Sequence, residues 1–268
     1  MKTNKIIREK LVFFFLKSLT LLVAVGVLGI VTFIGYKGLK KLSWEFIFSP
    51  AGHDGISGGI LLPLAGTLIL IVQTVIFAFP VGLLAGIFMN EYLREGRVKN
   101  FFRLMTMNLA GVPSIVFGLF GLAVFVKLCA FGPSILAGSL TLATLILPVL
   151  ITTTEESLRQ VEKDVRMASY ALGAGKWFTI RKVVLPLAFP NIVSGIILSI
   201  GRIAGETAPI IFTVAASYMV SMPSSWYDQV MALPFSIYFL AVQHPDPGAS
   251  KEVAYGCGPC FTDHPICF

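Results

Sequence analysis

The chain has 268 residues, of which 56% are hydrophobic and only 13% are charged, and its formal net charge is +7. Soluble globular domains carry roughly twice that charged fraction, so the composition excludes an ordinary soluble protein and predicts a membrane protein. In such a protein the distribution of basic residues reports loop orientation, and we expect no nucleic acid partner.

Apolar residues cluster into runs long enough to cross a bilayer. A helix needs about 20 such residues to span a hydrocarbon core ~30 Å thick, and five runs approach that length. The sequence therefore predicts an all-α membrane protein, a polytopic helical bundle with five full spans. The runs lie near Ser18–Tyr36, Leu64–Met89, Leu104–Val126, Ser134–Thr153 and Leu187–Tyr218.

The N-terminal segment 1–17 is basic and precedes the first run. A signal peptide has a shorter apolar region and a small-residue cleavage site, so we interpret this run as a retained first span. Fifteen basic residues fall in segment 1–17 and in the loops after the second and fourth runs, against five on the opposite side. Because basic loops stay in the cytoplasm, this bias predicts a cytoplasmic N-terminus.

Helix-breaking residues interrupt two of the runs. Pro80, Gly82 and Gly86 lie within the second, and Gly111-Val-Pro-Ser114 opens the third. Small residues four apart let helices pack closely in lipid, which favours a tight bundle. The alternative is that kinked helices free backbone groups toward a polar pathway, and the sequence leaves both interpretations open.

Segment 152–186 is a charged stretch between the fourth and fifth runs. Thr153 followed by Glu156 is typical of a capping box and predicts a helix start, whereas Gly173 predicts its C-terminal cap. A second short helix, Lys176–Val184, leads to the fifth run. We therefore expect a cytoplasmic helical hairpin that docks another protein, with a merely solvated surface as the alternative. One face of its first helix is predicted to be apolar, and it comprises Leu158, Val161, Val165, Ala168 and Leu172.

Arg202 and Glu206 are opposite charges four residues apart inside the fifth run. On a helix they share a face and can neutralise each other, which would only fix the rotation of the helix. Charges within spans usually face a bundle interior or a pathway, so the alternative is a polar site. Thr207 and Ser114 are weaker candidates for that site, because hydroxyls in spans more often bond their own backbone.

The outer segment 217–252 contains a short apolar run, Val230–Val242, interrupted by Pro234. This run is short for a full span. We expect an interfacial helix anchored by the amphipathic rings of Trp226 and Tyr227.

The tail 256–268 differs in character from the domain 18–255 before it. Its residues Cys257, Cys260, His264 and Cys267 are of zinc-ligand type, but their spacing is tight and we expect no metal site. Read one base later, the codons of this stretch permit a run of Ala, Val, Leu and Ile that would begin a membrane span. We therefore expect an aberrant, frameshifted tail and the loss of a sixth span.

The hairpin resembles the cytoplasmic loop of the permease subunits of bacterial ABC importers. Their signature reads Glu-Ala-Ala, three residues, Gly, nine residues, Ile-x-Leu-Pro, and this sequence departs from it at Met167, Ser169 and Val183. The resemblance implies that the hairpin inserts into a groove on a separate ATPase subunit and transmits its closure to the spans. The coupling residues that it implies are Met167, Ala168, Ser169, Gly173, Leu185 and Pro186.

Three separated stretches narrow the resemblance. Gly111–Val126, Ala171–Pro186 and Gly201–Thr213 are together similar to the A-type permeases of Pst-type phosphate importers. That family implies a related permease subunit as heterodimer partner, an ATPase subunit dimer on the cytoplasmic side and an extracytoplasmic phosphate-binding protein in a bacterial plasma (inner) membrane. It also implies inorganic phosphate as the substrate, with Arg202 as its contact, Glu206 as the counter-ion and no cofactor.

Other functions remain to be compared with this one. An importer of another oxyanion, such as sulfate or molybdate, would share the same architecture. An intramembrane enzyme is disfavoured, because the sequence has no His-Glu-x-x-His motif and no phosphate-cradling Gly-Lys-Ser/Thr loop. ATP hydrolysis is therefore expected in a separate subunit. A purely structural membrane subunit is a third possibility.

Overall fold

A computed structural model describes residues 2–39, 42–50, 58–215, 222–243, 250 and 253–257 of the chain, with side chains from residue 10 onward. Within these ranges all named elements are helices, which confirms the predicted all-α membrane fold. Four helices are long and apolar enough to cross a membrane, and a bent pair of helices would make a fifth. The first four predicted runs fall on these helices, and the fifth does so as far as Gly205.

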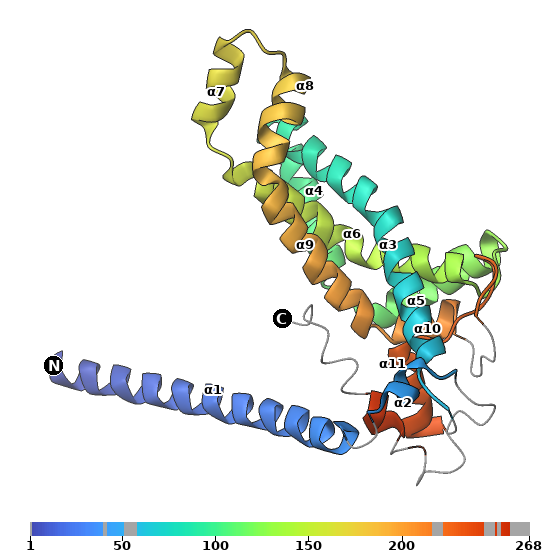
Figure 1. Cartoon of the computed structure of the whole chain (residues 1–268). Helices are drawn as coiled ribbons and strands as arrows, with labels where there is room; N and C mark the ends of the chain where they lie inside the picture. The colour runs from blue at the N-terminus through green and yellow to red at the C-terminus, as the bar shows by residue number, and fades with distance from the viewer. Residues whose placement is uncertain are drawn as a thin grey trace.

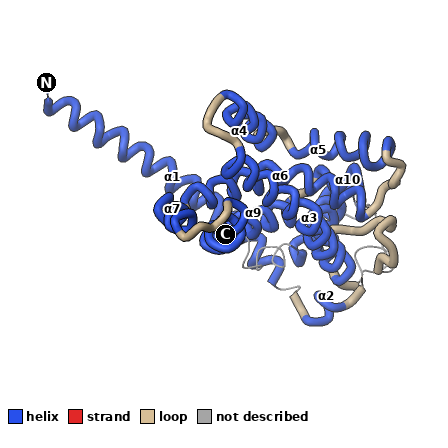
Figure 2. Tube along the Cα trace, turned by 90° about the horizontal axis from the view of Figure 1, so that it is seen from above, coloured by secondary structure: helices blue, strands red, loops and turns tan. Residues whose placement is uncertain are grey.

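The first helix, α1 (Lys2–Leu39), extends away from the other helices, as Figures 1 and 2 show. None of its most apolar stretch is buried within the chain. Its C-terminal end contacts the bundle, where the rings of Phe33 and Tyr255 meet edge to face. The short helix α2 (Trp44–Phe48) follows. An apolar helix this exposed needs lipid or another chain around it.

Three long helices form the centre of the bundle (Figure 1). They are α3 (Leu61–Ile87), α6 (Ile135–Gln160) and α9 (Leu185–Gly205). Helix α3 continues as a π-helical turn, η1 (Phe88–Tyr92). The main core is formed by apolar side chains of α3 and α6 together with Ile203 of α9 and residues later in the chain, such as Val214 and Phe235.

Glycines bring the three helices into close contact. A Cβ atom at Gly82 would lie 2.7 Å from Cβ of Leu150, and at Gly195 it would lie 2.9 Å from Cβ of Thr153. Helix α3 runs without a break through Pro80. Pro80 therefore does not interrupt the second span as expected, and its glycines follow the packing interpretation, in which small residues permit close approach.

The third predicted run is not one straight helix. It forms α4 (Arg97–Ala110) and α5 (Ser114–Gly121), the latter continuing as η2 (Leu122–Leu128), with a bend of 95° between them. Pro113 lies at the break, lacks an N–H group and disfavours helical geometry at the residue before it. This local restriction divides an otherwise continuous apolar run.

The helix formed by the apolar run Val230–Val242 is largely buried against the rest of the protein, and its position at a membrane interface stays a prediction. This helix, α11 (Leu233–Tyr238), starts beside Pro234, so this proline begins the helix and does not interrupt it. The helix continues as η4 (Phe239–Gln243). The Leu233 N–H donates to Oγ1 of the buried Thr67 at 2.9 Å. Burial of the Leu233 and Phe235 side chains supplies the stabilisation that lipid contact was expected to give.

The predicted aberrant tail lies outside the described residues from position 258 onward. Its first cysteine, Cys257, is buried in an apolar cluster with Ile60, Leu233 and Leu240. In the described part of the chain, no group of three or more metal-binding side chains comes together.

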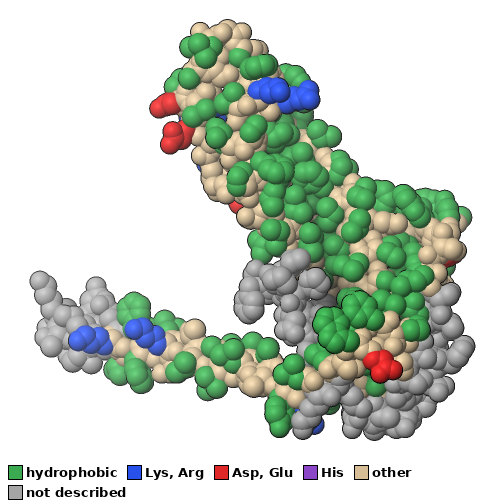
Figure 3. All heavy atoms as spheres, in the orientation of Figure 1, with side chains coloured by type: hydrophobic (Ala, Val, Ile, Leu, Met, Phe, Trp, Pro, Cys, Tyr) green, Lys and Arg blue, Asp and Glu red, His purple; other side chains and the backbone are tan. Residues whose placement is uncertain are grey.

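Hydrophobic side chains cover the middle of the face shown in Figure 3, and charged ones lie mainly near its ends. The hairpin helices α7 and α8 lie at one end of the bundle, and α2 and α11 lie at the other (Figure 1). This division fits a bundle that crosses a membrane with the hairpin on one side.

Candidate functional site: a charged hairpin and an intramembrane ion pair

The hairpin consists of α7 (Lys163–Ala171) and α8 (Lys176–Thr179). Gly173 joins them with φ +83, and its N–H donates to the Tyr170 carbonyl at 2.9 Å. The next N–H, from Ala174, reaches the Ser169 carbonyl at 3.2 Å. Such a left-handed turn satisfies the last carbonyls of a helix and favours glycine, which confirms the predicted cap.

The predicted start of the hairpin helix is wrong. Thr153 lies inside α6, where its hydroxyl donates to the Val149 carbonyl at 2.9 Å instead of capping a new helix. The chain breaks later, at Val161 and Glu162. The expected apolar face therefore does not lie on one helix: Leu158 is fully buried, whereas Leu172 is 90% exposed.

Two hydroxyl groups fasten the arms of the hairpin together. The Ser169 and Thr179 oxygens are 2.9 Å apart, and both side chains are buried. The Thr179 hydroxyl donates to the Gly175 carbonyl, so the Ser169 hydroxyl donates to Thr179. Serine at this signature position, where the resembled family has alanine, thus gains an inter-arm hydrogen bond.

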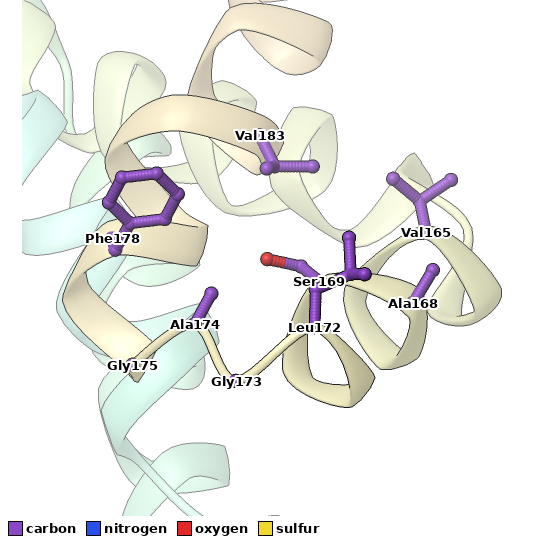
Figure 4. A pocket seen from close by; sticks show the side chains of 9 residues that line it. All are labelled: Val165, Ala168, Ser169, Leu172, Gly173, Ala174, Gly175, Phe178 and Val183. Carbon is purple, nitrogen blue, oxygen red and sulfur yellow. The ribbon is translucent and has the colours of Figure 1, made fainter.

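A hollow of about 640 Å³ opens between the arms (Figure 4). Its lining is mostly apolar, with Ser169 as its one hydroxyl side chain. Exposed apolar groups around it, such as Met167 and Trp177, leave a surface suited to another protein. The lining residues are Val165, Ala168, Ser169, Leu172, Gly173, Ala174, Gly175, Phe178 and Val183.

The six predicted coupling residues divide into two groups. Met167, Ala168, Ser169 and Gly173 lie in the hairpin, whereas Leu185 and Pro186 lie in the first turn of α9. Between the groups, the π-helical turn η3 (Ile180–Val184) joins α8 to α9. Leu185 packs against an apolar cluster at the base of the hairpin, formed by Ile87, Leu158, Val161, Ile180, Val184, Ala188 and Ile192.

Sequence reasoning missed a set of ion pairs around that base. The Arg166 guanidinium donates to the Glu91 carboxylate and, at 2.6 Å, to the Leu158 carbonyl. The Lys176 ammonium donates to the Glu91 backbone carbonyl and lies 4.5 Å from the centre of the Tyr92 ring. In the sequence, Arg166 and Lys176 contribute only to the count of basic residues that predicts loop orientation. Their partner lies about 80 positions away, beyond any periodic pattern.

A second ion network joins α4 to the same end of α6. Lys99 lies 2.8 Å from Glu95 and 3.8 Å from Glu155, and Arg103 also bonds Glu155. Lys99 and Glu155 are buried, and a buried charge is stable only beside an opposite charge, which this network provides for both. The hydrogen bond from Lys99 lowers the pKa of the exposed Glu95 carboxyl.

The intramembrane pair lies where α9 ends. Arg202 is in the last turn, and Glu206 is the C-cap residue with extended geometry (φ −76, ψ 128). Helix α10 (Ala208–Thr213) follows, with Pro209 near its start. The ring of Pro209 would clash with the Gly205 carbonyl in a continuous helix, so the predicted fifth span ends at Gly205 and does not reach Tyr218.

Arg202 and Glu206 nevertheless interact. Nε of Arg202 lies 3.5 Å from Oε1 of Glu206, and the two side chains are 36% and 14% exposed. Charge-assisted hydrogen bonds are usually about 2.7–2.9 Å long, so this pair is loose. A guanidinium has five N–H donors, and the single contact with Glu206 does not occupy all of them.

The other two predicted site residues lie on different elements. Thr207, half-buried, directly precedes α10, and Ser114, also half-buried, begins α5. Helices α5 and α10 touch closely, since a Cβ atom at Gly118 would lie 3.0 Å from Cα of Pro209. The fold thus places Ser114 on the helix that packs against α10.

Comparison with known proteins gives one family. Residues 78–242 match the binding-protein-dependent transport system inner membrane component. The probable ABC transporter permease protein YqgI of Bacillus subtilis is 36% identical over 88% of this chain and 80% of its own length. The phosphate transport system permease protein PstA of Mycobacterium leprae is 39% identical over 84% of this chain and 74% of its own. PstA 1 of Mycobacterium tuberculosis H37Rv is 37% identical over 84% and 73%.

Proposed function

Because this chain belongs to the family of binding-protein-dependent transport system inner membrane components, we propose that it is the A-type permease subunit of an ATP-driven importer of inorganic phosphate. The observation that carries this function is the identity to phosphate permeases over 84% of the chain. The family match over residues 78–242 includes the hairpin and the ion pair. The protein is a multi-pass membrane permease that works with other subunits of an ABC transporter.

The hairpin is the proposed contact with the ATPase. Its hollow and exposed apolar side chains support this role, because a monomeric membrane protein gains nothing from leaving such groups in water. We place the hairpin and the N-terminus in the cytoplasm of a bacterial cell, with the protein in the inner membrane. The remaining partners are a related permease subunit, an ATPase subunit dimer and an extracytoplasmic phosphate-binding protein.

Arg202 is the proposed phosphate contact, with Glu206 as its positioning counter-ion. A planar guanidinium stays charged at all physiological pH values and bonds phosphate oxygens through two parallel N–H groups. Glu206 holds the guanidinium loosely and moderates its field, so that phosphate can leave as well as enter. Thr207 offers a hydroxyl donor at the same break, and Ser114 offers one on α5, the helix that packs against α10.

Uptake of labelled phosphate by a bacterial strain that lacks its own A-type permease tests this function. We expect this chain to restore uptake, and excess sulfate or molybdate to leave it unchanged. Arg202→Gln should lower uptake about tenfold or more, because a hydrogen bond to a charged group contributes about 1.5–3 kcal/mol. Arg159→Gln, at an exposed arginine of α6, is the matched control.

Two results would count against the proposal. Competition by sulfate or molybdate would assign the permease to another oxyanion. Full uptake by an assembled Arg202→Gln transporter would reduce the pair to a structural one that only fixes the end of α9.

A further inference from the structure

Glu91 joins both arms of the hairpin to α3. Its carboxylate accepts hydrogen bonds from Arg166 in α7 and, at 2.8 Å, from the neighbouring Asn90. Its backbone carbonyl accepts a hydrogen bond from Lys176 at the start of α8. The Glu91 side chain is only 7% exposed, and the Arg166 side chain is 17% exposed. One residue of α3's π-helical end thus contacts both helices of the hairpin.

These contacts supply a connection that the backbone does not. The hairpin follows α6 after two residues, and α8 continues through η3 into α9. Any movement of the hairpin therefore reaches α6 and α9 through the chain itself. Helix α3, the third central helix, has no such backbone link to the hairpin, and its end lies beside α8 (Figure 1). Its share in the movement depends on side-chain contacts.

Two kinds of contact are present at this place. The apolar cluster at the base of the hairpin includes Ile87 of α3, and apolar surfaces hold helices together without fixing one register. The Arg166–Glu91 ion pair is directional and partly desolvated, and Arg166 also holds the last turn of α6 through the Leu158 carbonyl. The polar contacts therefore set how α3 is positioned relative to the hairpin.

Two π-helical turns lie near this connection, one at its Glu91 end and one between the hairpin and α9. Glu91 lies in η1 (Phe88–Tyr92), and the hairpin joins α9 through η3 (Ile180–Val184). Such turns are rare, are often found at functional sites and interrupt the regular hydrogen-bond pattern of a helix.

We propose that Glu91 is a positioning residue for transport: its pair with Arg166 makes α3 follow the hairpin when the ATPase moves it. The inference rests on the proposed coupling role of the hairpin. Glu91 touches neither phosphate nor nucleotide. Its effect is on how much transport each ATP produces, rather than on assembly or on the ATPase reaction.

The test uses the complete transporter in proteoliposomes, with its partner permease, ATPase subunits and phosphate-binding protein. Phosphate uptake and ATP hydrolysis are measured together, and their ratio gives the coupling. Glu91→Gln and Arg166→Gln should each lower phosphate moved per ATP about tenfold while the ATPase rate without binding protein is retained. Glu156→Gln, at an exposed carboxylate of α6, is the control and should couple normally.

The charge exchange Glu91→Arg with Arg166→Glu separates positioning from mere folding. If the pair transmits movement, the exchange should recover much of the coupling lost in either single variant. Normal coupling in assembled Glu91→Gln would overturn the inference. An exchanged pair that assembles but does not recover coupling would also overturn the inference, even if neither single variant assembles. An absence of phosphate uptake in the unaltered transporter would refute the proposed function itself, before Glu91 is considered.

Discussion

Replacing Gly86 with valine tests how closely α3 and α6 are packed. A Cβ atom at Gly86 would lie 2.6 Å from Cβ and Cγ2 of Thr154, whereas nonbonded carbon atoms are most stable about 3.5–4.0 Å apart. The shortfall is therefore about 1 Å. Thr154 is buried and its Cβ is fixed to the backbone of α6, so the helices themselves would have to separate.

Overpacking of this kind costs about 1–3 kcal/mol. We expect Gly86→Val to lower the Tm of the purified protein by ~2–4 °C for each kcal/mol lost. Gly29→Val is the matched control, because no atom lies within 4 Å of a Cβ at Gly29 in the exposed helix α1. Both substitutions change helix propensity equally, so the difference between them isolates packing. Equal Tm values for the two variants would refute the close packing of α3 on α6.

Two further predictions concern turns. Gly173→Ala should lower phosphate transport per ATP, because a non-glycine residue at φ +83 costs about 1–2 kcal/mol. Gly175→Ala in the same turn is the control and should not lower it, because φ is −74 at that position. Equal coupling in both variants would show that the hairpin does not depend on the left-handed geometry at Gly173. Hydrogen bonds from the Ser224 and Ser225 N–H groups lower the pKa of the Asp228 carboxyl. Ionised Asp228 therefore stabilises the fold at pH values above the ordinary aspartate pKa of about 3.9, and this stabilisation is lost as the pH falls through the lowered pKa. The Tm difference between the unaltered protein and Asp228→Asn should therefore shrink on acidification. A difference that does not change with pH would contradict a stabilising role for ionised Asp228.

The long helices could be predicted because the bilayer requires long apolar runs, and such runs are visible without knowledge of packing. Their breaks could not be placed from hydropathy, which reports composition and not backbone continuity. Pro113 and Pro209 each divide an apolar run that reads as continuous. The capping-box pattern at Thr153 failed for a related reason: the hydroxyl of a threonine inside a helix is satisfied equally well by the Val149 carbonyl.

The candidate site was only partly visible in the sequence. The Arg202–Glu206 pair was found because its members are close in the chain and lie in an apolar run. The Arg166–Glu91 pair was not, since 75 positions separate its members and no periodicity relates them. A carboxylate that ends an apolar span, such as Glu91, was the available signal. Only the fold identifies the arginine that it meets.

The segment Lys176–Gly205 is a single helical stretch of 30 residues, with the hairpin at one end and Arg202 at the other. At a rise of about 1.5 Å per residue it forms a rod ~45 Å long. If such a rod pivots near its middle, a tilt of about 5° displaces each end by ~2 Å in opposite directions. That displacement is comparable to the difference between a bound and a broken hydrogen bond. On the proposed function, a small displacement of the hairpin by the ATPase would therefore be enough to weaken the contact of Arg202 with an anion at the other end of this helical stretch.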